Sequence, residues 1–315
     1  MRGITSLDEI SASLDEILKD VILRNPSLSE PQIVAMYINR IQQYNNKYPI
    51  WIPWSGYYRL QIRSKVVSQK PYALFAKVIH QKPYALFNTG PCNKTGPCNK
   101  NRVELGDILF VVKYYKYNNK NKSRMIDQMR VSFLQAKLNK NTNSWKISAH
   151  QQEFLFTPSK YSFHFGQSWG DSKERTRRIT SKSKWLFTYL LMSTSKDIPN
   201  LAASPELVEC WRDPIQPCKD YTIPVSSFVS VFCSKTPIFM CGGYALWLYK
   251  FLRKNGIGGY IINKGQTSNS ELEDLVNTIY RFTGLLPDPP DEFEGYSGEG
   301  TFGIVEFTFT PLEEG

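Results

Sequence analysis

The hydrophobic positions of the first 44 residues repeat at helical spacing. Between Ser6 and Arg24, apolar residues recur every three or four positions, which is typical of a helix with one buried face. Ser6 and Glu9 have the spacing of a capping box at the start of this helix, and Pro26 follows its end. A second amphipathic helix is expected from Ser29 to Tyr44.

The rest of the chain alternates between strand-like and helix-like segments. Ile108 to Val112 is a short, β-branched apolar run, typical of a strand that is buried on both faces. The pattern therefore predicts a mixed α/β (α+β) fold with a central mixed sheet. The expected strands are Tyr57–Val67, Val103–Tyr115, Val131–Leu138, Tyr161–Gly166, Trp185–Met192 and Thr301–Thr310, and the expected helices are Ala149–Phe156, Thr236–Asn255 and Glu271–Thr283.

Two segments interrupt this pattern. Pro49 to Trp54 reads as a stiff aromatic connector, whose Trp51 and Trp54 either stack on nucleic-acid bases or pack beneath a loop. The heptapeptide at Gln69–Phe75 recurs at Gln81–Phe87, and the hexapeptide at residues 89–94 recurs at residues 95–100. These repeats are too short for solenoid units, so we expect residues 69–100 to form an insertion with an exposed loop.

Composition is compatible with a large folded core. Hydrophobic residues make up 41% and aromatic residues 14% of the 315 residues, which excludes general disorder. A proline-rich connection at residues 195–224 predicts a change of subdomain. We therefore expect a core at residues 1–194, which carries the inserted repeats, and a C-terminal α+β subdomain with an acidic tail at residues 195–315.

The charge is uneven along the chain. The net charge is +11, yet residues 285–315 contain eight acidic residues and no Lys or Arg, so the preceding residues carry +19. Such a body attracts polyanions through phosphate contacts, although an ordinary basic surface is the alternative. The most basic segment is predicted to contact nucleic-acid backbone through Lys173, Arg175, Arg177, Arg178, Lys182 and Lys184.

Cysteine and hydropathy patterns point to a cytoplasmic protein. The N-terminus lacks the basic and apolar pattern of a secretory signal, and no apolar run reaches the roughly 18 residues of a membrane span. None of the six cysteines forms a Cys-x2-Cys pair, and the three histidines are not spaced to complete a zinc site. We expect reduced, mostly buried thiols and no membrane partner.

Candidate chemistry gathers around one predicted hairpin. Asp107 precedes the buried strand, and Gln135 and Lys137 lie on the next strand. Residues two apart in a strand face the same side, so Gln135 and Lys137 point together while Ala136 points into packing. If the strands pair, Asp107 meets the Gln-x-Lys pair, and carboxylate and amide oxygens are suitable ligands for Mg²⁺.

This arrangement resembles the PD-(D/E)xK nuclease superfamily, in a variant with Gln in place of the second acid. The resemblance implies a restriction-endonuclease-like core of order αβββαβ, with Mg²⁺ or Mn²⁺ as cofactor. It places the metal-binding Asp at Asp107, the variable acid or amide position at Gln135 and the catalytic Lys at Lys137. A further metal ligand is expected at Glu104, whereas the sequence leaves open whether Glu30 joins the site.

Two main functions follow from these observations. The resemblance implies a metal-dependent endonuclease that hydrolyses phosphodiester bonds in DNA more readily than in RNA, as an effector of restriction or anti-phage defence. The alternative is a catalytically degenerate nucleic-acid-binding or assembly protein on the same fold, with Gln135 as the trace of a lost ligand. A homodimer or a regulatory protein partner is compatible with both, and residues 195–315 are compatible with a sensor or docking module.

Overall fold

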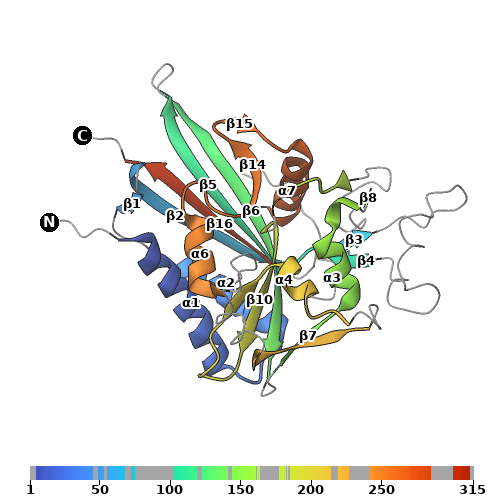
Figure 1. The fold of residues 1–315 in the computed structure, drawn as a ribbon. Coiled ribbons are helices and arrows are strands. Elements are labelled where there is room, and N and C mark those ends of the chain that lie inside the picture. Colours follow the sequence, from blue (N-terminus) through green and yellow to red (C-terminus); the bar gives the residue numbers. More distant parts are fainter. Residues whose placement is uncertain are drawn as a thin grey trace, which may run out of the picture.

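The chain folds around one curled, mixed β-sheet with helices on both faces (Figure 1). The computed structural model describes residues 5–44, 49–52, 55–67, 72–74, 102–118, 123–140, 144–160, 162–163, 177–181, 183, 185–213, 219–226, 242–284 and 301–312. Within these residues the expected mixed α/β class is confirmed.

Strand order in the central sheet differs from strand order in the chain. The order is β1 (Ile50–Ile52), β2 (Gly56–Val67), β16 (Phe302–Pro311), β5 (Ile108–Asn118), β6 (Ser123–Asn139), β10 (Phe187–Ser193), β11 (Leu201–Ala203) and β13 (Gly242–Gly243). Strands β16 and β5 run parallel, as do β10 and β6, and the other neighbours are antiparallel. The first half of β6 also pairs with β14 (Gly259–Asn263), which pairs with β15 (Gln266–Thr267).

Three small ribbons flank the central sheet. Each consists of two antiparallel strands and contributes no strand to the main sheet. They are β3 (Tyr72–Leu74) with β4 (Arg102–Glu104), β12 (Tyr221–Pro224) with β7 (Ser144–Ile147), and β8 (Ser162–Phe163) with β9 (Arg177–Arg178).

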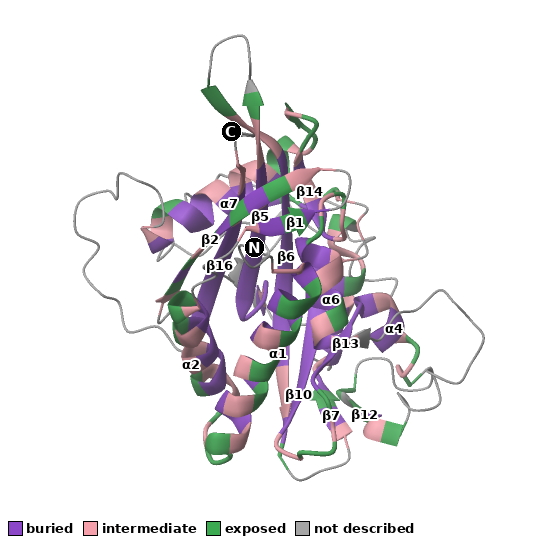
Figure 2. Cartoon of the chain, turned by 90° about the vertical axis from the view of Figure 1, so that its left-hand side faces the viewer, coloured by how far each residue is buried: buried purple, intermediate pink, exposed green. Residues whose placement is uncertain are grey.

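Each face of the sheet carries its own hydrophobic core. The first face is covered by α1 (Leu7–Arg24), α2 (Glu30–Gln43) and α6 (Tyr244–Leu252), and α1 and α6 lie in front of the strands in Figure 2. The second face is covered by α3 (Ala149–Phe156), α4 (Pro205–Glu209) and α7 (Ser270–Thr283), with the short 3-10 helix η2 (Pro158–Lys160) after α3.

Strand β5 shows why the central strands need apolar residues throughout. Ile108 and Phe110 contribute to the core of the first face, whereas Leu109 and Val111 contribute to the core of the second face. All four side chains are fully buried. The sequence-based expectation of a strand buried on both faces is therefore confirmed.

The two N-terminal helices form where their patterns predict them. The Ser6 hydroxyl accepts a hydrogen bond from the Glu9 backbone N–H, and the Glu9 carboxylate accepts one from the Ser6 N–H. A second capping box joins Ser29 and Gln32 at the start of α2. Both boxes satisfy N–H groups that a helix start leaves without intrahelical partners.

The described part of the strand predicted at residues 161–166 lies outside the central sheet. Its described part is β8, which pairs with β9 in a separate ribbon. The strand that lies parallel beside β6 is β10, in which Tyr189 pairs with Gln135 and Leu191 with Lys137. All seven residues of β10 are buried, which explains why this later apolar segment occupies the sheet interior.

The C-terminal elements share the central sheet with the N-terminal ones. Strand β16 lies between β2 and β5, and β11, β13 and β14 pair within the same sheet. A boundary at residue 194 therefore does not separate two sheets. None of the helices in the described part of the chain is both long and apolar enough to span a membrane.

Two local expectations were wrong. The helix predicted at residues 236–255 is described only as α6, because Gly242 and Gly243 before it pair with β11 as strand β13. The aromatic connector contains β1, whose Ile50 and Ile52 are buried beside β2. The expectation of mostly buried thiols stays a prediction, because Cys210 is exposed and the other five cysteines lie outside the described residues.

Candidate active site

The predicted hairpin is present and positions Asp107. Strands β5 and β6 pair antiparallel, with Ile108 opposite Leu134. The Asp107 N–H donates to the Leu134 carbonyl at 2.8 Å, and the Asp107 carbonyl accepts from the Gly303 N–H at 2.9 Å. The backbone of Asp107 is thus fixed between β6 and β16, at the point where β5 begins.

The Asp107 carboxylate contacts Gln135, the first member of the Gln-x-Lys pair, and the backbone of Ala136. Its Oδ2 atom accepts a hydrogen bond from the Ala136 N–H at 2.7 Å and one from the Gln135 side-chain amide at 2.5 Å. Asp107 and Gln135 are 0% and 1% exposed. Ala136 packs into the core of the first face, which confirms that it turns away from its two polar neighbours.

Glu30, whose participation the sequence leaves open, lies beside Lys137. It is the first residue of α2, and its Oε2 atom accepts a hydrogen bond from the Leu138 N–H at 2.9 Å. Its Oε1 atom lies 3.7 Å from the Lys137 ammonium nitrogen. The side chains of Lys137 and Glu30 are 19% and 24% exposed, so they form the solvent-facing rim of the cluster.

The two carboxylates continue the hydrogen-bond ladder of β6. Beyond the pair of Ile108 and Leu134, the N–H groups of Ala136 and Leu138 donate to Asp107 and Glu30 instead of to a β5 carbonyl. Alternate residues of a strand are about 7 Å apart. The backbone of β6 therefore holds the two carboxylates at a similar separation.

Gln151 is the member of the cluster that the sequence analysis missed. It lies in the first turn of α3, is 7% exposed, and its side-chain amide donates to the Gln135 side-chain oxygen at 2.5 Å. This contact fixes the direction of the Gln135 amide. The signal was the run of polar residues from His150 to Glu153, in a helix that ends with three apolar residues.

The donor atoms of the cluster are suitable for a hard divalent cation. Asp107 and Glu30 supply carboxylate oxygens, which Mg²⁺ and Mn²⁺ prefer. The predicted ligand Gln135 instead turns its amide nitrogen to Asp107 and its oxygen to Gln151. No group of three or more His, Cys, Asp or Glu side chains placed to hold a metal ion occurs among the described residues. The predicted ligand Glu104 lies at the end of β4, opposite Tyr72 of β3.

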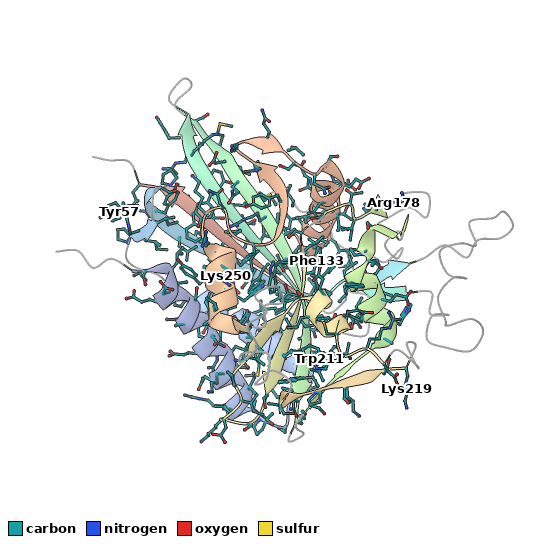
Figure 3. The ribbon with its side chains drawn as sticks, viewed as in Figure 1. Tyr57, Phe133, Arg178, Trp211, Lys219 and Lys250 are labelled. Atoms are coloured by element: carbon teal, nitrogen blue, oxygen red, sulfur yellow. The ribbon has the colours of Figure 1, made fainter. Side chains whose placement is uncertain are left out.

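The basic segment is described only in part. Arg177 is buried in β9, where its guanidinium lies 3.2 Å from the Asp274 carboxylate and 2.9 Å from the Thr278 hydroxyl of α7. This arginine is therefore engaged inside the protein. Arg178 is exposed beside it, and Figure 3 shows it on the right-hand side of the molecule. The other predicted contacts lie outside the described residues: Lys173, Arg175, Lys182 and Lys184.

Comparison with known proteins identifies no relative of this chain. The chain matches no family model, no curated protein and no solved structure.

Proposed function

We propose that the chain is a metal-dependent nuclease that hydrolyses phosphodiester bonds, with DNA as the preferred substrate. The observation that carries the proposal is the convergence of Asp107, Glu30, Gln135 and Lys137 at one end of the β5–β6 hairpin. These residues come from three separate elements. The carboxylates of Asp107 and Glu30 supply oxygen ligands for a divalent metal ion, and the Lys137 ammonium supplies a positive charge, both of which phosphodiester hydrolysis uses.

In this proposal the chain's own residues divide the work. Asp107 and Glu30 would hold Mg²⁺ or Mn²⁺, which when bound lowers the pKa of a bound water and polarises the phosphate, and the Gln135 amide would orient the Asp107 carboxylate. Lys137 places a positive charge at the rim, where it can orient the attacking water and offset charge that develops on the phosphate. Gln151 fixes the Gln135 amide, and Glu30 fixes the Lys137 side chain.

The burial of Asp107 favours a second candidate function. Its carboxylate accepts two hydrogen bonds inside the fold and is fully buried, as expected of a structural connection between strands. In that case the same fold would serve as a nucleic-acid-binding or assembly protein without cleavage. The proposed nuclease function also includes the expectations of a cytoplasmic location, a role in restriction or anti-phage defence, and a homodimer or a regulatory partner.

Cleavage assays separate the two candidates. Labelled single-stranded and double-stranded DNA and RNA are incubated with the full chain in Mg²⁺, in Mn²⁺ and in EDTA. We expect metal-dependent cleavage of DNA that is lost in Asp107→Asn and in Lys137→Met, both of which nearly preserve side-chain size. Asp8→Asn, at an exposed position in the first turn of α1, is the control and should cleave normally. Cleavage that survives both site substitutions would contradict the proposal, and binding without cleavage would favour the second candidate.

A further inference from the structure

An alternating row of exposed side chains runs along β2 on the second face of the sheet. Tyr58 and Leu60 of β2 contribute to the core of the first face, so the residues between them point to the opposite face. Tyr57, Arg59, Gln61, Arg63 and Lys65 are all exposed. We call these five residues the β2 stripe. Successive members are about 6.8 Å apart.

The stripe lies on a sheet edge that the described residues leave open. Strand β1 pairs with β2 only from Gly56 to Tyr58. From Arg59 onward, the outer side of β2 has no strand partner in the described part of the chain. A ligand can therefore approach the basic side chains of β2 both from the face of the sheet and from its edge.

The charge of the stripe is almost wholly positive. Within the described part of the chain, no carboxylate pairs with Arg59 or Lys65. Arg63 lies 3.9 Å from Glu306 on the neighbouring strand, but Glu306 is buried and already pairs with Lys113 at 2.6 Å. Three cations in a row with one shared, buried acid form a surface that attracts a linear polyanion.

One end of the stripe carries exposed aromatic rings. Tyr57 and Trp51 pair across β1 and β2, with ring centroids 4.9 Å apart, and are 44% and 46% exposed. In Figure 3, Tyr57 lies at the left-hand end of the sheet, far from the labelled Phe133 near the centre. Exposed aromatic rings beside cations are the combination that proteins use to stack the bases of single strands.

The other end of the stripe points toward the candidate active site. Val67 follows Lys65 on the same face and pairs with Phe302 of β16. The next residue of β16, Gly303, donates its N–H to the Asp107 carbonyl. Strand β2 and strand β5 are separated only by β16, which corresponds to about 10 Å between their backbones. The stripe therefore leads from the aromatic pair to the row of the sheet that contains Asp107.

We propose that the β2 stripe binds a single-stranded nucleic acid, with its phosphates along Arg59, Arg63 and Lys65 and a base against Tyr57. This inference deepens the proposed nuclease function by naming the path and the strandedness of the substrate, and it rests on that function for the direction of the strand toward Asp107. The competing explanation is edge protection, because charged residues on an edge strand prevent pairing with other sheets.

Binding is measured by the fluorescence anisotropy of a labelled thymidine oligonucleotide in EDTA, so that metal-dependent cleavage does not contribute. We expect the Arg59→Ala/Lys65→Ala variant to bind more weakly. The negative slope of the log binding constant against log salt should become less steep by about 1.4, which is the value for two lost single-strand phosphate contacts. Tyr57→Ala should raise Kd roughly five- to 150-fold. The control variant Lys19→Ala/Arg24→Ala removes the same charge from α1, on the first face, and should retain the wild-type slope.

Two results would overturn the inference. One is an unchanged slope in the stripe variant, or an equal change in the α1 control, which would leave edge protection as the role of the stripe. The other is tighter binding of the same sequence as a duplex. The outcome is separable from the nuclease proposal: wild-type protein that binds the strand through the stripe but never cleaves supports the inference and fails the nuclease. Cleavage that depends on Asp107 but not on the β2 stripe supports the nuclease proposal and contradicts the inference about the stripe.

Discussion

Glu30 and Asp107 accept hydrogen bonds from alternate backbone N–H groups of β6, at 2.9 Å from Leu138 and at 2.7 Å from Ala136. Helix α2 and the start of β5 are thereby attached to the same edge of β6. The two carboxylates replace the β5 carbonyls that would otherwise accept these bonds. The same contacts that stabilise the fold thus also bring the candidate ligands together.

Asp107 is both a structural hydrogen-bond acceptor and a candidate metal ligand, so its substitution should also change stability. Asp107→Ala removes the acceptor for the Ala136 N–H and for the Gln135 amide, both of which are buried. We expect a loss of about 2–5 kcal/mol in the free energy of unfolding, because an orphaned buried donor costs about 1–3 kcal/mol. Asp107→Asn keeps an acceptor oxygen and should lose less. Urea unfolding of the two variants checks the order, and an Ala variant as stable as the wild type would show that the contact is not made.

The contact between Gln151 and Gln135 makes a prediction for activity. Gln151→Ala removes the contact that fixes the Gln135 amide, so the rate of metal-dependent cleavage should fall roughly 10- to 100-fold, as for other residues that orient a metal ligand. The Mg²⁺ concentration for half-maximal cleavage should rise, and Gln151→Glu, which cannot donate to Gln135, should not restore it. A lowered rate with unchanged metal dependence would instead indicate a purely structural role for Gln151.

The lowered pKa of the buried Glu306 carboxyl should make the stability of the protein depend on pH. Burial acts to raise the pKa of Glu306, but the ion pair with Lys113 and the hydrogen bond from the Tyr280 hydroxyl outweigh it, so the pKa lies below its ordinary value. Because the folded-state pKa is the lower one, this carboxylate stabilises the protein above the unfolded-state value and loses that effect as the pH falls.

The variant Glu306→Gln tests this relationship. At pH 7 it should lower the free energy of unfolding by about 3–5 kcal/mol, because it leaves the Lys113 ammonium without its buried partner. The difference between variant and wild type should shrink as the pH falls below about 4.5, where the unfolded-state carboxylate begins to protonate. Urea unfolding at pH 7 and at successively lower pH measures it, and a difference that grows on acidification would contradict the account.

Gly303 of β16 lies so close to Ile38 of α2 that a side chain at this position should clash. A Cβ atom at Gly303 would lie 1.8 Å from the Ile38 Cδ1 atom, whereas one at Gly243 would have no heavy atom within 4 Å. Gly303→Ala should therefore destabilise the protein by about 1–3 kcal/mol, as overpacked cores do. The control Gly243→Ala should cost less than about 1 kcal/mol. Thermal unfolding compares them, and equal values would show that the close approach of α2 is not required.

The sequence predicted the parts of the site that depend on local periodicity. The period-two pattern of β6 was enough to place Gln135 and Lys137 on one side and Ala136 on the other, and the adjacent strands paired as a hairpin. The capping box of α1 was equally local. Each of these features depends on residues within a few positions of one another.

The remaining features depend on tertiary packing that local patterns do not encode. Nothing in the alternation of β16 indicates that it lies between β2 and β5, and the apolar run of β10 does not reveal that it replaces residues 161–166 beside β6. The sequence left open whether Glu30 joins the site, because its contact with Leu138 joins residues far apart in the chain. Gln151 was missed for the same reason.

Binding of a divalent cation tests the central claim most directly, since it requires neither the right substrate nor an activating partner. Mn²⁺ is titrated into the full chain and the free ion is followed by electron paramagnetic resonance, for the wild type, Asp107→Asn, Glu30→Gln and the surface control Asp8→Asn. The account predicts one site per chain, weakened at least about tenfold in the two site variants and unchanged in the control. Wild-type protein that binds no ion, or site variants that bind it as the wild type does, would contradict it.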